Sequence, residues 1–459
     1  MYQLNFKKPI HVHFIGIGGI SMSGLAEILL EEGFTISGSD SKQSKLTDIL
    51  TAKGAFVYIG QKAENIADHP ALIVYTAAIH EDNEEFAAAK SAGIPMLTRA
   101  QLLGQIMDHY AQSIAVAGTH GKTTTTSMIS QILLTAKTDP TISVGGILDA
   151  IGGNIRVGSS DVFITEACEY TNSFLNFRPR YSIITSVEAE HLDFFKDIDD
   201  IRHSFHAFAG NTEEGGALII NGQIEELHSI TNGLTCNVIT YGFHETDDYY
   251  PKDISFDDRG CAVYTAMHHN KALGKITLSV PGMHNVANSL AAIALCLTMG
   301  LSMDIISQGI TQFGGTKRRF EYKGTVNGVT VIDDYAHHPT EVEATLTAAK
   351  NYPHNRIICV FQPHTYSRTN AFYKDFARVL SSADIVVLAD IYAAREKNTI
   401  GIDSTIILKE LEKLDCECYY FPSFAEIEKF LSQKCMNNDL LITMGAGDIC
   451  QIGEHMLAQ

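Results

Sequence analysis

Short apolar runs alternate with longer amphipathic segments along most of the chain. His11 to Ile15 reads as a buried strand, and the next segment places Ile20, Leu25 and Ile28 at helical spacing. Because strands that alternate with helices form parallel sheets, the pattern predicts an α/β fold. Further expected strands are 71–77, 113–117, 161–166 and 181–186, and further expected helices are 45–53, 83–92, 98–109, 122–137 and 197–208.

The length of the chain and the recurrence of this pattern predict three domains. A chain of 459 residues is longer than one core usually holds. We place the domains at 1–110, 111–315 and 316–459, with Rossmann-like α/β folds at both ends and a P-loop-type ATPase fold in the centre. The polar segment 244–259 reads as a loop.

The segment from Ser113 to Thr126 has the order of a phosphate-binding turn: a short strand, a glycine loop and the start of a helix. Unpaired backbone N–H groups at a helix start attract phosphate, and glycines allow its close approach. Lys122 would then contact the β- and γ-phosphates, and Thr123 would hold a magnesium ion. The usual loop has a longer spacing between its glycines, whereas only two residues separate Gly118 and Gly121, so an ordinary strand-to-helix turn is the alternative.

A second glycine loop follows the first expected strand. Gly16, Gly18 and Gly19 precede a helix, and Asp40 ends the next strand, as in a dinucleotide-binding unit. The third glycine of that motif falls on Ser21, which weakens the case for a nicotinamide cofactor.

Two polar side chains follow expected strands of the central domain. Glu166 ends one strand and His191 lies beyond another, on the sheet edge that the Lys122 loop also occupies. A carboxylate and an imidazole there suit magnesium bound to ATP, although His191 alone could be an ordinary loop histidine. Asn285 and Asn288 share a face at the start of a later helix, where a capping role is the alternative.

Composition limits the class of protein. The 34 basic and 53 acidic residues give a net charge of −19, which argues against a nucleic-acid-coating surface. We find no signal peptide and no run able to span a bilayer, and nine scattered cysteines fit a reducing cytosol. The sequence therefore predicts a cytoplasmic protein without membrane or nucleic-acid partners, and a monomer–dimer equilibrium stays open.

Several motifs occur together in one order along the chain. Between about residues 10 and 450 it resembles the Mur ligase family, through IGIGGISMSGLAEIL, GTHGKTTTTS, EACEY, EAEHLDFF, PGMHNVAN, KRRFE, DDYAHHPTEV, FQPHTYSRT, AREK and TMGAGD.

The resemblance implies ATP-driven amide bond formation in bacterial peptidoglycan synthesis. The motifs match best the branch that joins L-alanine to the lactyl carboxylate of UDP-N-acetylmuramate, through an acyl phosphate, with release of ADP and phosphate. The alternative within the family is the recycling ligase that adds the tripeptide L-Ala-γ-D-Glu-meso-diaminopimelate. A nicotinamide-dependent dehydrogenase and a silent UDP-sugar-binding protein are weaker alternatives, because neither explains Lys122, Glu166 and His191 together.

The resemblance also implies roles for individual residues. Lys122, Glu166, His191, Arg319 and Asp334 would be catalytic, and Thr123, Glu166 and His191 would bind Mg²⁺. ATP would be bound by Gly118, Thr119, His120, Gly121, Lys122, Thr123, Thr124, His284, Asn285, Asn288, Arg319 and Asp334, the last on its ribose side. The UDP-sugar would be bound by Gly16, Gly18, Gly19, Ile20, Ser21, Asp40, Thr76, Ala77 and Ala78, and the amine by Tyr335, His337, His364 and Arg368.

Several sister ligases in the family carry a carbamylated lysine about fifteen residues beyond the metal histidine. His206 stands near that position here, and Lys196 lies too close to His191 to replace it. We therefore expect no carbamate.

Overall fold

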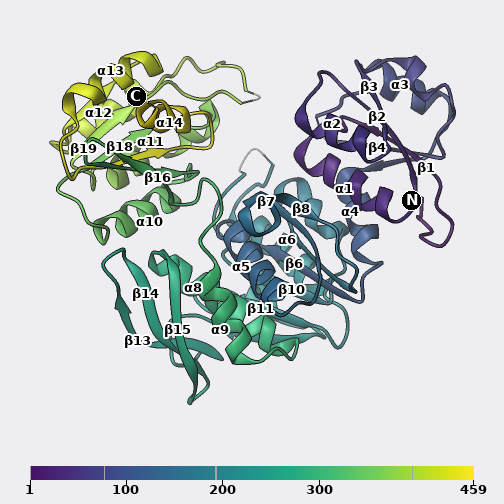
Figure 1. Cartoon of the computed structure of the whole chain (residues 1–459), viewed down its shortest axis with the longest axis horizontal. Coiled ribbons are helices and arrows are strands. Elements are labelled where there is room, and N and C mark those ends of the chain that lie inside the picture. The colour runs from purple at the N-terminus through teal and green to yellow at the C-terminus, as the bar shows by residue number, and fades with distance from the viewer. Residues whose placement is uncertain (1, 77, 192–193, 395, 459) are drawn as a thin grey trace. The chain divides into compact units, whose positions relative to one another are not determined.

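Three sheets of mainly parallel strands, flanked by helices, organise the part of the chain that the structure describes (Figure 1). The structure is a computed structural model that describes residues 2–76, 78–191, 194–394 and 396–458. The chain divides into a first unit, residues 1–250 with 290–309, and a second unit, residues 251–289 with 310–459. The predicted three-domain α/β fold is confirmed, whereas the predicted boundaries at 110 and 315 stay predictions.

The first domain is a doubly wound parallel sheet with the order β3-β2-β1-β4-β5. The sheet order reverses at β1 and β4, and a crevice at the carboxyl ends of such strands is the usual ligand site. The predicted strands and helices of this region are confirmed. Its elements are β1 (His11–Ile15), α1 (Ile20–Glu31), β2 (Thr35–Asp40), α2 (Lys45–Ala52), β3 (Phe56–Ile59), 3-10 helix η1 (Ala63–Ile66), β4 (Leu72–Tyr75), α3 (Glu84–Ser91), β5 (Met96–Thr98) and α4 (Arg99–Met107).

A network of hydrogen bonds between buried polar groups extends to the glycine loop of this domain. His13 and Glu85 are fully buried, and His13 Nε2 lies 2.8 Å from Glu85 Oε1. The Ser39 hydroxyl donates to the second Glu85 oxygen, and Ser37 Oγ lies 2.7 Å from His13 Nδ1. The Ser39 carbonyl in turn accepts from the backbone N–H of Gly16 at 2.8 Å, so the network reaches the loop.

The central domain contains the parallel strands β12-β11-β10-β6-β9-β7, and β8 pairs antiparallel with β7. Strand β6 lies between β10 and β9, so the loops after these three strands share one rim of the sheet. Its elements are β6 (Gln112–Ala117), α5 (Lys122–Thr135), β7 (Thr141–Leu148), η2 (Asp149–Ile151), β8 (Gly153–Arg156), β9 (Val162–Glu166), η3 (Tyr170–Asn176), β10 (Tyr181–Ile184), α6 (Ile198–Gly210), β11 (Ala217–Asn221), α7 (Leu227–Thr231) and β12 (Asn237–Tyr241).

The expectation of a loop at 244–259 is wrong, because β13 (Tyr249–Phe256) occupies much of it. Charged residues such as Lys252 and Asp253 hide the strand in the sequence, and pairing with β14 supplies the order that local composition does not. β14 (Cys261–His268) and β15 (Lys271–Pro281) form an antiparallel hairpin, followed by α8 (Met283–Thr298) and α9 (Met303–Gln312).

The C-terminal domain has the sheet order β16-β17-β21-β18-β19-β20. Among the described strand pairs of this sheet, only β16–β17 is antiparallel, so the predicted parallel sheet is confirmed apart from this edge hairpin. Its elements are β16 (Glu321–Val326), β17 (Val329–Asp334), α10 (Pro339–Lys350), β18 (Ile357–Phe361), α11 (Tyr366–Leu380), β19 (Ile385–Leu388), α12 (Thr405–Glu412), β20 (Cys418–Tyr420), α13 (Phe424–Lys434), β21 (Leu440–Met444) and α14 (Cys450–Leu457).

Within the first unit, the first domain packs closely on the central domain. A Cβ added at Gly24 of α1 would lie 2.3 Å from Ile155 of β8, and one at Gly104 of α4 would lie 2.2 Å from the carbonyl oxygen of Asn176. These glycines allow the helices to approach the central domain. One apolar cluster includes Ile106 of α4 and buried phenylalanines of the central domain.

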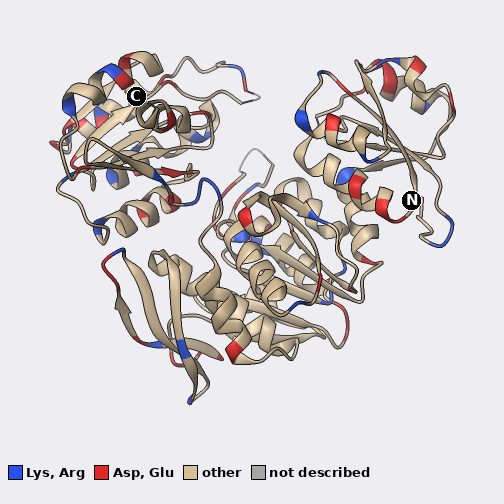
Figure 2. Ribbon diagram, viewed as in Figure 1, with Lys and Arg blue, Asp and Glu red and all other residues tan. Residues whose placement is uncertain are grey.

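Charge is distributed over the whole fold. Lys and Arg are interspersed with Asp and Glu along the ribbon (Figure 2). Among the described helices, none is long and apolar enough to cross a membrane.

We expect Glu85→Ala to lower the free energy of unfolding by about 3 kcal/mol or more, because it leaves His13 and Ser39 buried without their shared acceptor. Urea unfolding followed by circular dichroism measures the change. Glu81→Ala is the control, since Glu81 is exposed and pairs with the exposed Lys90, and it should unfold close to the wild-type midpoint. Equal midpoints for Glu85→Ala and the wild type would contradict this account of the network.

Candidate functional site

The loop between β6 and α5 follows a path that only glycine permits at two positions. Gly118 has φ of 139° and Gly121, the residue before α5, has φ of 83°. A Cβ at Gly118 would lie 2.0 Å from Thr185 Oγ1 and 3.0 Å from the backbone N of Ser186. The two glycines bend the chain sharply into the amino end of a helix of 14 residues.

The loop is fixed to the neighbouring strand end by hydrogen bonds. The backbone N–H of Thr119 donates to Ser186 O at 3.0 Å, and that of His120 donates to Ser186 Oγ at 2.8 Å. The Thr119 hydroxyl accepts from the N–H of Glu188 at 2.9 Å. The shape of the loop is therefore set by residues after β10. The first turn of α5, which includes the half-buried Thr124, has backbone N–H groups without an acceptor inside the helix, as at any helix start.

Lys122 is held by a buried carboxylate. Its Nζ lies 3.1 and 3.2 Å from the two oxygens of Glu169, whose side chain is 3% exposed. It also donates to the carbonyl oxygens of Gly118 and, at 3.1 Å, Thr119. Burial is the largest single effect and would lower the pKa of Lys122, but the charge and hydrogen bond of Glu169, together with the nearby Cys168 and Glu190, outweigh it and raise the pKa above its ordinary value. Lys122 therefore stays protonated at neutral pH.

Thr123 and Glu166 provide oxygen ligands of the kind that Mg²⁺ prefers. Thr123 Oγ1 donates to Glu166 Oε2 at 3.0 Å, and the other Glu166 oxygen accepts from the backbone N–H of Gly145 at 2.6 Å. Glu166 ends β9 and Thr123 lies in the first turn of α5, so two adjacent strand ends bring the pair together. The donor set fits a magnesium ion beside the loop.

His191 lies next to a different carboxylate. Its Nε2 is 3.7 Å from Glu169 Oε1, and the ligand atoms of Glu169, Glu190 and His191 all lie within 4.8 Å of one another. Glu169 and Glu190 are both buried. This second group also suits a divalent cation in its residue types, and it shares Glu169 with Lys122.

The glycine loop of the first domain contacts two other segments that were predicted to bind the UDP-sugar, at Asp40 and at Thr76. Gly18 N donates to Asp40 Oδ2 at 2.9 Å, and a Cβ at Gly16 would lie 3.0 Å from Thr76 Cγ2. Asp40 therefore already holds the loop through a hydrogen bond. The remaining predicted residues of this loop are Gly19, which precedes α1, the exposed Ile20, Ser21 in the first turn, and Ala78, whose N–H donates to Thr76 Oγ1; Ala77 lies outside the described residues.

The asparagines of α8 engage each other and the preceding segment. Asn288 Nδ2 donates to Asn285 Oδ1 at 3.1 Å, and Asn285 Nδ2 donates to Pro281 O at 2.7 Å. Both side chains are buried, whereas His284 is exposed. Neither printed contact is a bond from a backbone N–H to the Asn285 side chain, so these contacts are not those of a helix cap. A role of these residues in binding adenine stays a prediction.

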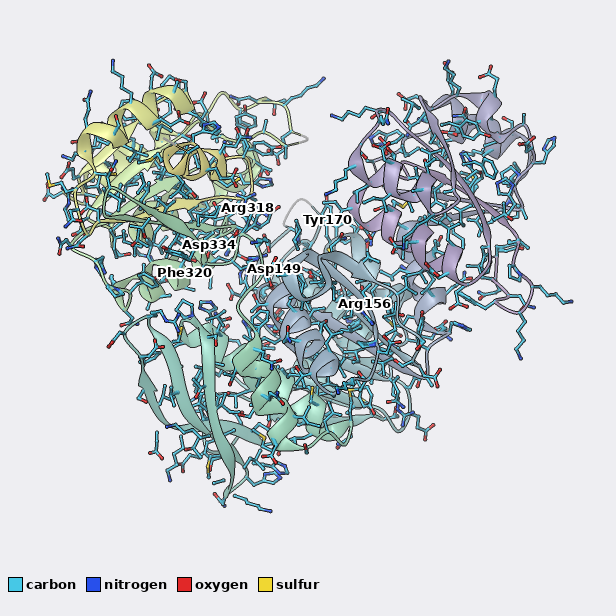
Figure 3. The ribbon with its side chains drawn as sticks, viewed as in Figure 1. Asp149, Arg156, Tyr170, Arg318, Phe320 and Asp334 are labelled. Carbon is cyan, nitrogen blue, oxygen red and sulfur yellow. The ribbon has the colours of Figure 1, made fainter. Side chains whose placement is uncertain are left out.

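In the second unit, Arg318, Phe320 and Asp334 come from neighbouring segments (Figure 3). The Asp334 carboxylate accepts from the N–H groups of Phe320 at 2.9 Å and Ala336 at 2.8 Å. Burial raises the pKa of Asp334 to about 6, although the charge of Arg319 and these two donors oppose the shift. The Arg319 guanidinium stacks 5.2 Å from the Tyr335 ring centroid and lies 3.8 Å from Glu341.

The four residues predicted to bind the amine form one row in the second unit. The ring centroids of Tyr335 and His337 are 5.5 Å apart, and those of His337 and His364 are 5.6 Å apart. Arg368 Nη1 lies 3.1 Å from His364 Nδ1. The structure therefore brings these side chains together, from the end of β17 to the start of α11.

Sequence reasoning missed Glu169 and Glu190. Glu169 lies in the same motif as Glu166, and Glu190 lies in the same motif as His191. A carboxylate shortly after a buried strand, next to a cationic loop, is the available signal, but the sequence does not tell which of two nearby glutamates faces the lysine.

Comparison with protein families matches consecutive segments of this chain. Residues 11–111 match the Mur ligase family catalytic domain, 116–296 the Mur ligase middle domain, and 318–447 the Mur ligase glutamate ligase domain.

Full-length relatives and solved structures agree with these matches. The chain is 68% identical over 457 residues to the UDP-N-acetylmuramate–L-alanine ligase of Agathobacter rectalis, covering 100% of both chains. The solved UDP-N-acetylmuramate-alanine ligase of Thermotoga maritima is similar, with a TM-score of 0.81, 29% identity and 98% of each chain covered. A murein peptide ligase of Psychrobacter arcticus shares the fold at a TM-score of 0.70 and 24% identity, with 98% of each chain covered.

We expect the Asp334 carboxyl to titrate near pH 6 in the folded protein and near its ordinary value of 3.8 once unfolded. The folded protein then binds more protons between these values, so this residue should make the free energy of unfolding fall as pH rises from about 4 to about 6. Asp334→Asn removes this titration. The difference in free energy of unfolding between the variant and the wild type should therefore change by up to about 3 kcal/mol between about pH 4 and about pH 6. Urea unfolding at a series of pH values measures this, and a constant difference from pH 4 to 7 would contradict it.

Proposed function

The chain belongs to the Mur ligase family, and we propose that it joins L-alanine to the lactyl carboxylate of UDP-N-acetylmuramate with ATP as the energy source. The observation that carries the proposal is similarity to L-alanine ligases over the whole length of the chain. The Lys122 loop and the groups beside it supply a physical basis for ATP-dependent chemistry.

The reaction consists of two transfers. A carboxylate oxygen attacks the γ-phosphorus of ATP, and the bond from this phosphorus to the β-γ bridging oxygen breaks. The products of this step are an acyl phosphate and ADP. The amine of L-alanine then attacks the acyl carbon, loses a proton, and the tetrahedral adduct collapses to the amide as inorganic phosphate leaves. Both steps bring negative charges together, so fixed positive groups and backbone N–H donors provide most of the stabilisation.

Lys122 is the principal cation in this scheme. In the structure its charge is balanced by Glu169 and by the carbonyl oxygens of the loop. Phosphate oxygens of ATP would compete for the same ammonium hydrogens and would add the N–H groups at the start of α5 as further donors. We propose that Lys122 exchanges part of its contact with Glu169 for the β- and γ-phosphates, while Glu169 stays close enough to keep the lysine positioned.

Magnesium would be held by Thr123 and Glu166, with His191 as ligand of a second ion. Bound magnesium would neutralise phosphate charge and align the γ-phosphoryl group with the acceptor. The oxygens of Thr123 and Glu166 already lie 3.0 Å apart, so little rearrangement is needed. Glu169 and Glu190 are available to orient His191.

The remaining predicted contacts divide among the domains. The first domain, at 1–110, would bind UDP through the loop between Asp40 and Thr76, and the central domain, at 111–315, would bind ATP. The third domain, at 316–459, would provide Arg319 for phosphate, Asp334 for the ribose side, and the row from Tyr335 to Arg368 for L-alanine. His284, Asn285 and Asn288 would contact adenine.

The cellular setting follows from the substrates. A ligase that consumes ATP and a UDP-linked precursor works where both are made, so we propose a cytoplasmic location and a contribution to cell-wall growth, cell shape and division. The excess of acidic residues argues against a nucleic-acid partner.

The second candidate is the recycling ligase that adds L-Ala-γ-D-Glu-meso-diaminopimelate to the same nucleotide. A murein peptide ligase has the same fold, so the fold does not separate the two activities. Full-length identity to L-alanine ligases favours the first candidate.

We expect phosphate release in the presence of ATP, Mg²⁺ and UDP-N-acetylmuramate to depend on L-alanine and to be much slower with the tripeptide. A coupled phosphate assay with each amine, and with neither, measures the preference. Omission of UDP-N-acetylmuramate is the control for unspecific ATP hydrolysis. Faster turnover with the tripeptide than with L-alanine would establish the recycling activity instead.

A further inference from the structure

Arg99 lies beside the glycine loop of the first domain. It is the first residue of α4, follows the capping residue Thr98, and is half-buried. Its Nη1 donates to Ser21 Oγ at 3.1 Å. Ser21 lies in the first turn of α1, directly after the loop. The guanidinium therefore stands at the end of a helix whose N–H groups already favour negative charge.

Arg99 has no carboxylate partner among the residues that the structure describes. Burial lowers its pKa, and the Cys168 thiol is the group that opposes this effect. Two other partly buried arginines do have carboxylate partners: Arg318 lies 2.9 Å from Asp333 and Arg356 lies beside Asp439. A half-buried arginine without a carboxylate partner, placed beside the start of a helix, is suited to bind an anion.

Arg99 lies near the segment that contacts Lys122. Cys168 immediately precedes Glu169, the carboxylate that pairs with Lys122. The position is fixed by packing, because α1 and α4 approach the central domain at Gly24 and Gly104 within the same unit. Arg99 thus lies between the first-domain glycine loop and the segment that holds Lys122.

We propose that Arg99 binds an oxyanion of the nucleotide-linked sugar acid, either a phosphate of its diphosphate or its lactyl carboxylate. The inference rests on the proposed function and adds a binding residue to it. A guanidinium offers several N–H donors in a planar fork, and only one contact, to Ser21, is made by protein side chains in the described residues. The other donors can form paired hydrogen bonds to a phosphate or a carboxylate.

The test measures the affinity of UDP-N-acetylmuramate and UDP-N-acetylglucosamine by isothermal titration calorimetry for the wild type, Arg99→Gln and Arg99→Lys. The two ligands share the diphosphate, and only the first carries the lactyl carboxylate. We expect Arg99→Gln to raise the Kd of UDP-N-acetylmuramate by about tenfold to a hundredfold, because a charged hydrogen-bonded contact is lost. Arg99→Lys should recover part of the affinity, since it keeps the charge without the fork.

The controls separate a binding role from general damage. Lys90→Gln removes one positive charge from the same domain at an exposed residue that pairs with Glu81, and it should leave both Kd values unchanged. The affinity of a non-hydrolysable ATP analogue should also be unchanged by Arg99→Gln.

Each outcome has one meaning. Weaker binding of both UDP-sugars supports a phosphate contact, and weaker binding of UDP-N-acetylmuramate alone supports a carboxylate contact. Unchanged affinity for both, or an equal loss for the ATP analogue, would overturn the inference while leaving the proposed function intact. Failure of the wild type to bind UDP-N-acetylmuramate would overturn both.

Discussion

The ion pair between the half-buried Lys122 and the buried Glu169 is the interaction on which the central site depends. A cation placed at a helix start and largely removed from water would be costly without a compensating charge, and Glu169 provides it at 3.1 Å. The same contact keeps the ammonium group in the loop before a nucleotide arrives. Its partner, three residues beyond the end of β9, also approaches His191. One carboxylate thus links the phosphate loop to the second group of metal-ligand side chains.

The sheet order explains why these groups meet. Lys122 follows β6, Glu166 and Glu169 follow β9, and His191 follows β10, and these strands are adjacent and parallel. Parallel strands bring their carboxyl ends to one rim, so residues far apart in the sequence become neighbours there. The glycines at 118 and 121 then let the loop bend close to Thr185 and Ser186, which set its shape.

Much of this arrangement could be predicted from the sequence, because local patterns determine it. The strand, glycine turn and helix around Lys122 follow from apolar periodicity and from the residues that a tight turn requires. Strand ends at Glu166 and Asp40 were found in the same way. The row from Tyr335 to Arg368 depended on resemblance to known ligases, and the structure brings its members into contact.

The remaining features depend on tertiary contacts that periodicity does not encode. β13 contains Lys252 and Asp253 and reads as a loop until its pairing partner is known. Glu169 and Arg99 differ from neighbouring charged residues only in what surrounds them: Glu169 has a half-buried lysine beside it, and Arg99 has no carboxylate partner in the described part of the chain. Sequence spacing identifies which residues are near a sheet edge, but not which of them face each other.

The most direct test of the central claim, that Lys122 grips the triphosphate whose terminal group is transferred, is the rate of L-alanine incorporation by Lys122→Ala. Lys137→Ala, an exposed residue beyond the other end of α5, is the matched control, and thermal unfolding by circular dichroism verifies the fold of both variants. The account predicts a loss of at least about a hundredfold in kcat/KM for Lys122→Ala and a rate near wild type for the control. Incorporation of L-alanine by folded Lys122→Ala at the wild-type rate would contradict it.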